Sequence, residues 1–241
     1  MYIFLVRRDI RRYDPRMVAM NDKIMEPKTS GWRGSRELWL EAAKQALLET
    51  GLDSVKIQPL ASRLNISRTS FYWFFKDRHA LLDALLEEWE AKNTGAFVDA
   101  CEAYAETPAE AVLNLIGVFI DESQFEPRLD FAIRGWAHRS DSVAERVNAA
   151  DERRLAAIRS MFERFGYVTE DADTRARTVY LTQIGYISMQ VAEGLQTRMD
   201  RIPGYVRIYS GHAPTVSELA RFHARHGFAG QETGIAAHNA V

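Results

Sequence analysis

The clearest potential for chemistry in this sequence lies in five consecutive aromatic residues, Phe71-Tyr72-Trp73-Phe74-Phe75. On a helix, Phe71, Phe74 and Phe75 share one face and can pack on neighbouring helices. Tyr72 and Trp73 then lie on the opposite side. An exposed Tyr–Trp pair flanked by arginine and lysine is a reasonable surface for nucleic acid. The alternative that stays open is that Tyr72 and Trp73 pack beneath a second domain.

The charge around these aromatics differs from the charge of the whole chain. The 241 residues contain 31 lysines and arginines against 33 aspartates and glutamates, which argues neither for nor against nucleic acid. Residues 63–78, however, contain four basic residues and one acid. The basic residues are Arg63, Arg68, Lys76 and Arg78. This local excess of positive charge favours a phosphate-binding surface, although the net charge of the whole chain is close to zero.

The elements that must position these residues are predicted to be helices. Leucine, alanine, glutamate and arginine recur at helical spacing, while valine and isoleucine do not alternate with polar residues. Signals such as Ser35 and Gly51 mark helix ends, and Pro203-Gly204 is expected to interrupt the chain before the last helix. The expected helices are 35–51, 57–64, 68–75, 78–104, 107–122, 128–138, 142–165, 170–195 and 215–227. We therefore predict an all-α protein.

Two short predicted helices, 57–64 and 68–75, are separated by the turn Asn65-Ile66-Ser67. This is the spacing of a helix-turn-helix, whose second helix enters the DNA major groove, although such helix pairs are common in helical proteins. The segment LASRLNISRTSFYWFFKDRHALLDALL resembles the DNA-binding signature of tetracycline-repressor (TetR) family regulators. In that signature an L-A-x-x-x-G-V-S turn precedes a helix ending in T-x-Y-x-x-F, and a lysine opens the next helix. The resemblance covers about residues 35–89.

The resemblance implies a role for individual residues. Tyr72 would contact one phosphate, and Arg78, in place of the usual lysine, would bind another at the start of the long helix. Arg68, Thr69, Ser70 and Trp73 would lie nearest the base edges. The residues expected to bind DNA are Lys56, Gln58, Ser67, Arg68, Thr69, Ser70, Tyr72, Trp73, Lys76 and Arg78.

Three positions depart from the family signature. Asn65 replaces the usual turn glycine, a mild change because asparagine tolerates positive φ. Phe74 stands where histidine is frequent, which removes one polar contact. Lys56 occupies the usual Ser/Thr N-cap of the second helix, where it cannot accept the cap hydrogen bond but could reach a phosphate.

The resemblance and the helix pattern together predict four regions. A flexible N-terminal arm covers residues 1–29, and a helix-turn-helix DNA-binding domain covers 30–77. A helical effector-binding and dimerisation domain covers 78–227, and a flexible tail covers 228–241. The long helix that starts at Arg78 is expected to couple the two folded domains.

A short recognition helix reads few base pairs, so useful specificity calls for a two-fold dimer on a palindrome. The predicted helices 142–165 and 170–195 are the candidates for a four-helix interface, as the resemblance also implies. An ordinary buried helix is the alternative. The residues expected at the interface are Ala176, Tyr180, Ile184, Ile187, Ser188 and Val191.

The helices between about residues 81 and 138 could enclose a ligand cavity. The residues expected to line it are Phe97, Cys101, Phe119, Trp136 and His138. Aromatic and apolar residues at helical spacing also fit a plain core, and that alternative stays open. An effector held by such residues would be organic and fairly apolar.

Several classes of protein are disfavoured by what the sequence lacks. The single cysteine, Cys101, provides no disulfide framework and favours a reducing compartment. The apolar run at residues 2–6 is too short for a signal peptide, and no stretch approaches the roughly 20 apolar residues of a membrane span. No Gly-rich phosphate loop, G-x-S-x-G motif or metal-ligand spacing of histidines occurs. We expect a soluble, cytoplasmic protein that is no enzyme and uses no cofactor or metal.

These features predict a sequence-specific transcriptional regulator, in the family's usual mode a repressor. It would bind a palindromic operator in double-stranded DNA as a homodimer and would be released by a small, fairly apolar effector. Two alternatives stay open: a helical ligand-binding or interaction protein that does not bind DNA, and a constitutive DNA binder without an effector.

Overall fold

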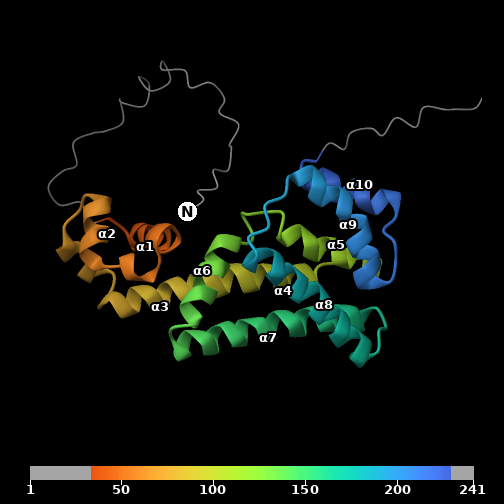
Figure 1. The fold of residues 1–241 in the computed structure, drawn as a ribbon, viewed down its shortest axis with the longest axis horizontal. Coiled ribbons are helices and arrows are strands. Elements are labelled where there is room, and N and C mark those ends of the chain that lie inside the picture. The colour runs from red at the N-terminus through yellow and green to blue at the C-terminus, as the bar shows by residue number, and fades with distance from the viewer. Residues whose placement is uncertain (1–33, 229–241) are drawn as a thin grey trace, which may run out of the picture.

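The computed structural model describes residues 34–228, and every regular element within that range is a helix (Figure 1). The predicted all-α class is therefore confirmed. The predicted arm, residues 1–29, lies outside the described residues, as does all but the first residue of the predicted tail, 228–241. No helix among residues 34–228 is both long and apolar enough to cross a membrane.

The helices follow the predicted order with one addition near the C-terminus. The α-helices are α1 (Arg36–Thr50), α2 (Ile57–Leu64), α3 (Arg78–Trp89), α4 (Gly95–Glu102), α5 (Pro108–Val118), α6 (Pro127–Ala137), α7 (Asp141–Arg164), α8 (Thr169–Ser188), α9 (Leu195–Ser210) and α10 (Val216–Arg225). The 3₁₀ helices η2 (Leu52–Ser54) and η3 (Arg68–Trp73) and the π-helix η4 (Glu90–Thr94) lie between them.

Side-chain caps explain several of the helix starts. The hydroxyl of Ser35 accepts a hydrogen bond from the backbone N–H of Leu38 at 3.2 Å, which satisfies one free donor of the first turn of α1. At α10, Thr215 and Glu218 form a capping box. The helix expected over 142–165 begins one residue earlier, at Asp141, with Ser140 as its N-cap residue and no side-chain cap bond.

The predicted helix 78–104 is interrupted by a π-turn. The π-helix η4 lies between α3 and α4 and turns the polar side chains of Asn93 and Thr94 into the interior. Asn93 donates to the backbone carbonyl of Glu126 at 3.3 Å and accepts from its backbone N–H at 3.0 Å. Single π-turns inside α-helices are rare overall, but many of those that occur lie at functional sites. The segment Glu90–Thr94 is therefore a candidate functional segment.

The predicted helix 170–195 is wrong at its C-terminal end, since α8 stops at Ser188 and a separate helix, α9, follows. Pro203 was expected to break the chain but lies inside α9. A proline in a helix interior costs about 3 kcal/mol because it removes a hydrogen bond and clashes with the preceding turn. The apolar stripe of α9, which includes Met199, Ile202 and Val206, is buried, and this burial offsets the cost.

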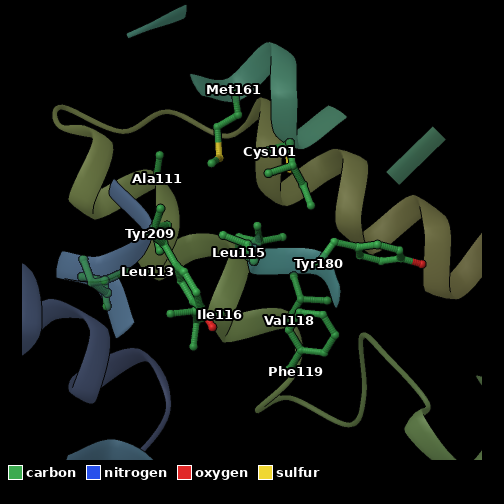
Figure 2. Packing of buried hydrophobic residues seen from close by; sticks show 14 of the residues in the cluster. Cys101, Ala111, Leu113, Leu115, Ile116, Val118, Phe119, Met161, Tyr180 and Tyr209 are labelled. Atoms are coloured by element: carbon green, nitrogen blue, oxygen red, sulfur yellow. The ribbon is translucent and has the colours of Figure 1, made fainter. Parts of the chain in front are cut away.

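The buried side chains form two clusters. One joins α1, α2 and α3 to Leu129, Ile133 and Trp136 of α6 and to the first half of α7. The other joins α4, α5, the second half of α7, α8, α9 and α10, and Figure 2 shows part of it. Packing is therefore continuous across residue 78, because α6 lies against both α1 and α3 (Figure 1).

Candidate nucleic-acid interface

The turn between α2 and η3 is closed by a left-handed residue. Asn65 has φ 53° and ψ 44°, and the backbone N–H of Ile66 bonds to the carbonyl of Ala61 at 3.1 Å. A glycine adopts this conformation without strain, and asparagine is among the side chains that tolerate it. The replacement of the usual turn glycine therefore leaves the helix-turn-helix geometry intact.

The third element of the unit is a 3₁₀ helix where an α-helix was predicted. Its start is capped by Ser67, whose hydroxyl accepts from the backbone N–H of Thr69 at 3.2 Å. Phe71 packs edge-on against Trp39 of α1, with ring centroids 5.1 Å apart, and stacks with Phe75 at 5.5 Å. These buried rings hold η3 on the first helix of the unit.

The opposite side of η3 faces outward. Tyr72 is 55% exposed and Trp73 is 64% exposed. Arg68, Thr69 and Lys76 beside them are exposed as well. As predicted from helical spacing, Tyr72 and Trp73 lie on the outer side of η3. Adjacent exposed aromatic rings beside cations form a surface suited to a binding partner.

The second helix contributes to the same surface from its first turn. Lys56 is the N-cap residue of α2, makes no side-chain cap bond and is exposed, as is Gln58. No acid occurs between Asp53 and Asp77. Of the basic residues in this stretch, Arg63 forms two hydrogen bonds with Glu49 at 2.8 and 2.6 Å. The exposed charge of the unit is therefore positive around Lys56, Arg68 and Lys76.

Two residues predicted to bind DNA have other contacts in the structure. Ser70 is buried, and its hydroxyl donates to the carbonyl of Ser67 at 2.7 Å, so it does not lie on the outer face with Trp73. The guanidinium of Arg78 donates to the backbone carbonyls of Val55 and Leu52, the latter at 3.0 Å. Ser70 is therefore directed into the turn, and Arg78 ties the start of α3 to the segment before α2. Their predicted roles in DNA binding stay predictions.

A second polar group, which the sequence analysis missed, is buried where the two hydrophobic clusters meet. Arg154 of α7 and Asp130 of α6 are both 0% exposed and form an ion pair at 3.1 Å. Arg154 also donates to the hydroxyls of Thr94 at 3.0 Å and Tyr180 at 3.3 Å. The indole N–H of Trp89 donates to Asp130 at 2.9 Å. This group, with Arg134 and Asp151, is called the junction cluster below.

The outer half of the junction cluster is a second ion pair. Arg134 donates to Asp130 at 2.8 Å and to both carboxylate oxygens of Asp151 at 2.9 and 2.6 Å. Burial alone would raise the pKa of Asp130, but Arg154 and Arg134 outweigh it and hold that pKa below its usual range. Burial also raises the pKa of the Tyr180 phenol. The cluster thus connects α3, η4, α6, α7 and α8 through charged groups that are paired inside the protein.

The five residues predicted to line a ligand cavity are not brought together. Phe97, Cys101 and Phe119 lie in the larger cluster, with the rings of Phe97 and Phe119 4.9 Å apart. Trp136 belongs to the other cluster, and His138 is exposed at the end of α6. Burial raises the pKa of the Cys101 thiol to about 12, so this thiol stays protonated at neutral pH.

The residues predicted at a dimer interface are also divided. Ala176 and Tyr180 were predicted at the interface, but both are buried within the single chain and face its core. Ile184 and Ile187 are partly buried, and Ser188 is exposed at the last position of α8. Val191 is exposed but lies beyond the end of that helix. On its inner face, α8 is an ordinary buried helix, which was the alternative to an interface helix.

The described residues form a groove along α4 and a pocket beside α9. A groove of about 650 Å³ runs along α4 and is lined by residues that include Asp99, Tyr104 and Arg225. A smaller pocket lies between α5, α8 and α9. Within residues 34–228, no three histidine, cysteine or acidic side chains are grouped as they would be to hold a metal ion.

Comparison with known families supports the predicted helix-turn-helix. The sequence model of the family described as "Bacterial regulatory proteins, tetR family" matches residues 40–85. Similar curated proteins are the tetracycline repressor proteins of class D from Escherichia coli and class H from Photobacterium damsela subsp. piscicida. Each is 41% identical over 61 residues, which are 25% of this chain and 28% of the relative. The chain thus matches little more than a quarter of the length of these relatives.

Solved structures resemble a larger part of the chain. Mycobacterium smegmatis AmtR has a TM-score of 0.58 and 19% identity, and the match covers 85% of this chain and 99% of AmtR. The ketosteroid transcriptional regulator KstR2 of Mycobacterium tuberculosis has a TM-score of 0.55 and 19% identity, over 75% of this chain and 95% of KstR2. At these identities the likeness establishes a shared fold that extends beyond the matched DNA-binding segment.

Proposed function

We propose that the chain is a sequence-specific DNA-binding transcriptional repressor of the tetR type rather than an enzyme, because the tetR family model matches residues 40–85 and the class D tetracycline repressor is 41% identical over 61 residues. It would act on chromosomal operators in the cytoplasm, as a homodimer, and leave them when a small organic effector binds. The observation that carries this proposal is the exposed pair Tyr72 and Trp73 on η3, with cations beside it.

The proposed contacts with DNA divide into two kinds. Lys56, Lys76 and the hydroxyl of Tyr72 would bind phosphates, which sets affinity and its dependence on salt. Arg68, Thr69 and Trp73 would approach the base edges, and Gln58 and Ser67 would support the same surface from the adjoining turns. Phosphate contacts position the unit on the duplex, so sequence preference would depend on the few residues of η3.

The proposed dimer uses the outer faces of α8 and α9. Leu181 of α8 is 60% exposed and Ile208 of α9 is 64% exposed, and Met189 lies exposed just after α8. By contrast, none of the large exposed apolar side chains identified among residues 34–228 belongs to α7. Two helices from each subunit would form a four-helix bundle and bury these side chains. In this proposal α9, rather than the predicted α7, would pair with α8.

Release by an effector would require a path from the larger domain to η3. The junction cluster is suited to this because α3, which leads from the DNA-binding unit, is bonded through Trp89 to α6 and through η4 to α7. An effector that favours one arrangement of these helices by about 1–3 kcal/mol would change DNA affinity by roughly 5- to 150-fold.

Selection of bound DNA from a random pool tests the proposed function. The full chain is expected to enrich a palindrome whose half-sites lie about one helical turn apart, since that reports DNA binding and two-fold symmetry together. The variant Trp73→Ala should lose the enriched sequence while keeping its helical circular dichroism. Failure of the wild-type chain to enrich any sequence would contradict the proposal, and enrichment of an asymmetric site would contradict the dimer.

A further inference from the structure

The pocket between α5, α8 and α9 combines an apolar wall with converging polar groups. Ile116 of α5, Ile120 in the turn after it and Ile202 of α9 form the wall. The polar side chains around it are Gln183, Tyr186, Glu193, Arg198, Arg201 and Tyr205. Ligand sites in proteins characteristically have this composition, an apolar surface with a few convergent polar groups.

Glu193 carries an acceptor that nothing in the protein uses. One of its carboxylate oxygens is paired with Arg201, while the other, Oε2, is buried and has no hydrogen-bond partner. Buried polar atoms without a partner are uncommon, because each forfeits its hydrogen bond to water. A free acceptor at the edge of a pocket points to a hydrogen-bond donor supplied from outside the chain.

Two tyrosines line the pocket, and a third packs behind them. The hydroxyls of Tyr186 and Tyr205, which line it, bond to each other at 2.8 Å, and the ring of Tyr209 stacks on that of Tyr205 at 5.6 Å. Tyr209 is buried, and Figure 2 shows it among the buried side chains of α5. Stacked rings provide a flat surface on which another aromatic ring can pack.

The pocket is closed in this conformation, because its free volume of about 30 Å³ has room for water but not for an aromatic ring. Glu193 at its edge belongs to the non-helical segment 189–194 between α8 and α9. Gln190 in this segment has a left-handed φ of 50°, which is uncommon for a residue other than glycine. The ion pair of Glu193 with the half-exposed Arg201 holds the segment to α9, and ion pairs in contact with solvent are weak.

We propose that this pocket opens to bind a small phenol-like effector, with its ring on the isoleucine wall and its hydroxyl donating to Glu193. The inference rests on the proposed function, since it names the chemical class of the molecule that would release the DNA. Arg198 and Arg201 make the charge around the pocket positive, which favours a phenol over an amine as the donor.

The position of the pocket connects it to the rest of the molecule. Gln183 lines the pocket from α8, and Tyr180, one turn earlier on the same helix, is bonded to Arg154 and Asp151 of the junction cluster. A ligand that displaces the start of α9 or shifts α8 would therefore act on the side chains that hold α3 and α6.

Binding of phenol and toluene to the full chain, measured by titration calorimetry, tests the proposal. Phenol and toluene match in ring size, but only phenol has a donor. Phenol is expected to bind at least tenfold more tightly than toluene, and Glu193→Leu should weaken phenol binding about tenfold or more while leaving toluene binding unchanged. The matched control Glu163→Leu, at an exposed position of α7, should leave both unchanged.

A second variant guards against loss of structure at Glu193. Tyr205→Phe keeps the ring stacking and removes only the hydroxyl pair, and it should weaken phenol binding several-fold. Equal binding of phenol and toluene, equal phenol binding by wild type and Glu193→Leu, or no phenol binding at millimolar concentration would overturn the site. Operator binding in a gel shift separates the two proposals, because a chain that binds DNA but not phenol keeps the proposed function and loses this site.

Discussion

The outer face of η3 and the junction cluster use the same kinds of side chain in opposite surroundings. On η3, Tyr72 and Trp73 are exposed beside cations. In the junction cluster, the guanidinium of Arg154 lies 5.3 Å from the ring of Trp89 and 5.4 Å from that of Phe97, all of them buried. The cations beside Tyr72 and Trp73 are exposed and can bind phosphate. The buried Arg154 is instead paired with the carboxylate of Asp130 inside the chain.

The comparison shows how burial decides the role of an arginine beside aromatic rings. A charge taken out of water must be paired, so Arg154 serves cohesion between helices. A charge left in water gains little from an internal partner and stays available to bind DNA. Changes in the two regions should therefore separate stability from DNA affinity.

The largest effect is expected from Arg154→Met. The substitution removes the fully buried cation beside Asp130, which keeps its bonds to Arg134 and Trp89. Breaking a buried ion pair costs about 3–5 kcal/mol of unfolding free energy, so the loss is expected at the lower end of that range. Urea denaturation of Arg154→Met, with Arg153→Met at the neighbouring exposed position as control, measures it. A loss below about 1 kcal/mol would show that the cluster is not a cohesive element.

The double variant Arg154→Met with Asp130→Leu sharpens the same point. Removing both charges leaves no unpaired ion, so much of the lost stability should return. The measurement is the same urea titration, read as a double-mutant cycle. If the double variant were as unstable as the sum of the single variants, the two side chains would act independently.

A smaller effect is expected from Arg78→Met, which tests whether this arginine belongs with the buried or the exposed set. Loss of its bonds to the carbonyls of Val55 and Leu52 should lower the unfolding free energy by about 2 kcal/mol. If Arg78 instead binds phosphate, stability would stay unchanged while the dependence of DNA affinity on salt became shallower. Thermal unfolding and gel shifts at several salt concentrations distinguish these outcomes.

Tyr72→Phe should weaken DNA binding by about 1 kcal/mol, the size of one hydrogen bond, on all sequences alike. Because Tyr72 is exposed, the unfolding free energy should change by less than about 0.5 kcal/mol. Gel shifts on the selected operator and on a scrambled duplex measure the first quantity. A change in sequence preference at constant affinity would contradict the phosphate contact.

The smallest effect concerns pH and the partly buried His226, which lies outside both regions. Burial, followed by the nearby Arg225, lowers the pKa of His226, whose Nε2 has no partner and lies against Gly117. The unfolded chain then binds a proton more readily than the folded chain, so stability falls as the pH drops below about 6.5. His226→Gln should lessen this acid-side loss relative to wild type, measured by urea titration between pH 8 and pH 5. An unchanged pH profile would remove His226 as its source.

Local signals in the sequence were sufficient where short-range chemistry decides the structure. Ser35 caps α1 as predicted, and the helices expected from residues 107 and 215 start at the capping hydroxyls of Thr107 and Thr215. Such a cap needs only a hydroxyl and a free N–H three residues later. The division of the aromatic run also follows from helical spacing, with Phe71 and Phe75 inside and Tyr72 and Trp73 outside. A 3₁₀ turn in place of an α-turn did not alter that division.

Long-range packing decided what these signals could not. Pro203 and Gly204 predicted an interruption of the helix. Burial of the apolar face of α9 keeps both residues helical. Arg78 matched a phosphate-binding position, but carbonyls 23 and 26 residues earlier in the chain hold its guanidinium. Neither outcome depends on the residues nearby in the sequence.

The sequence by itself determined the helical class, the helix-turn-helix and the side of η3 that meets the solvent, since these depend on spacing and on caps within one or two turns. Only the tertiary structure decided that Arg154 and Asp130 meet and that an acceptor of Glu193 stays free beside a pocket. The physical reason is that charge pairing and burial join residues far apart in the chain, for example 24 positions apart for Arg154 and Asp130, and spacing carries no record of such contacts.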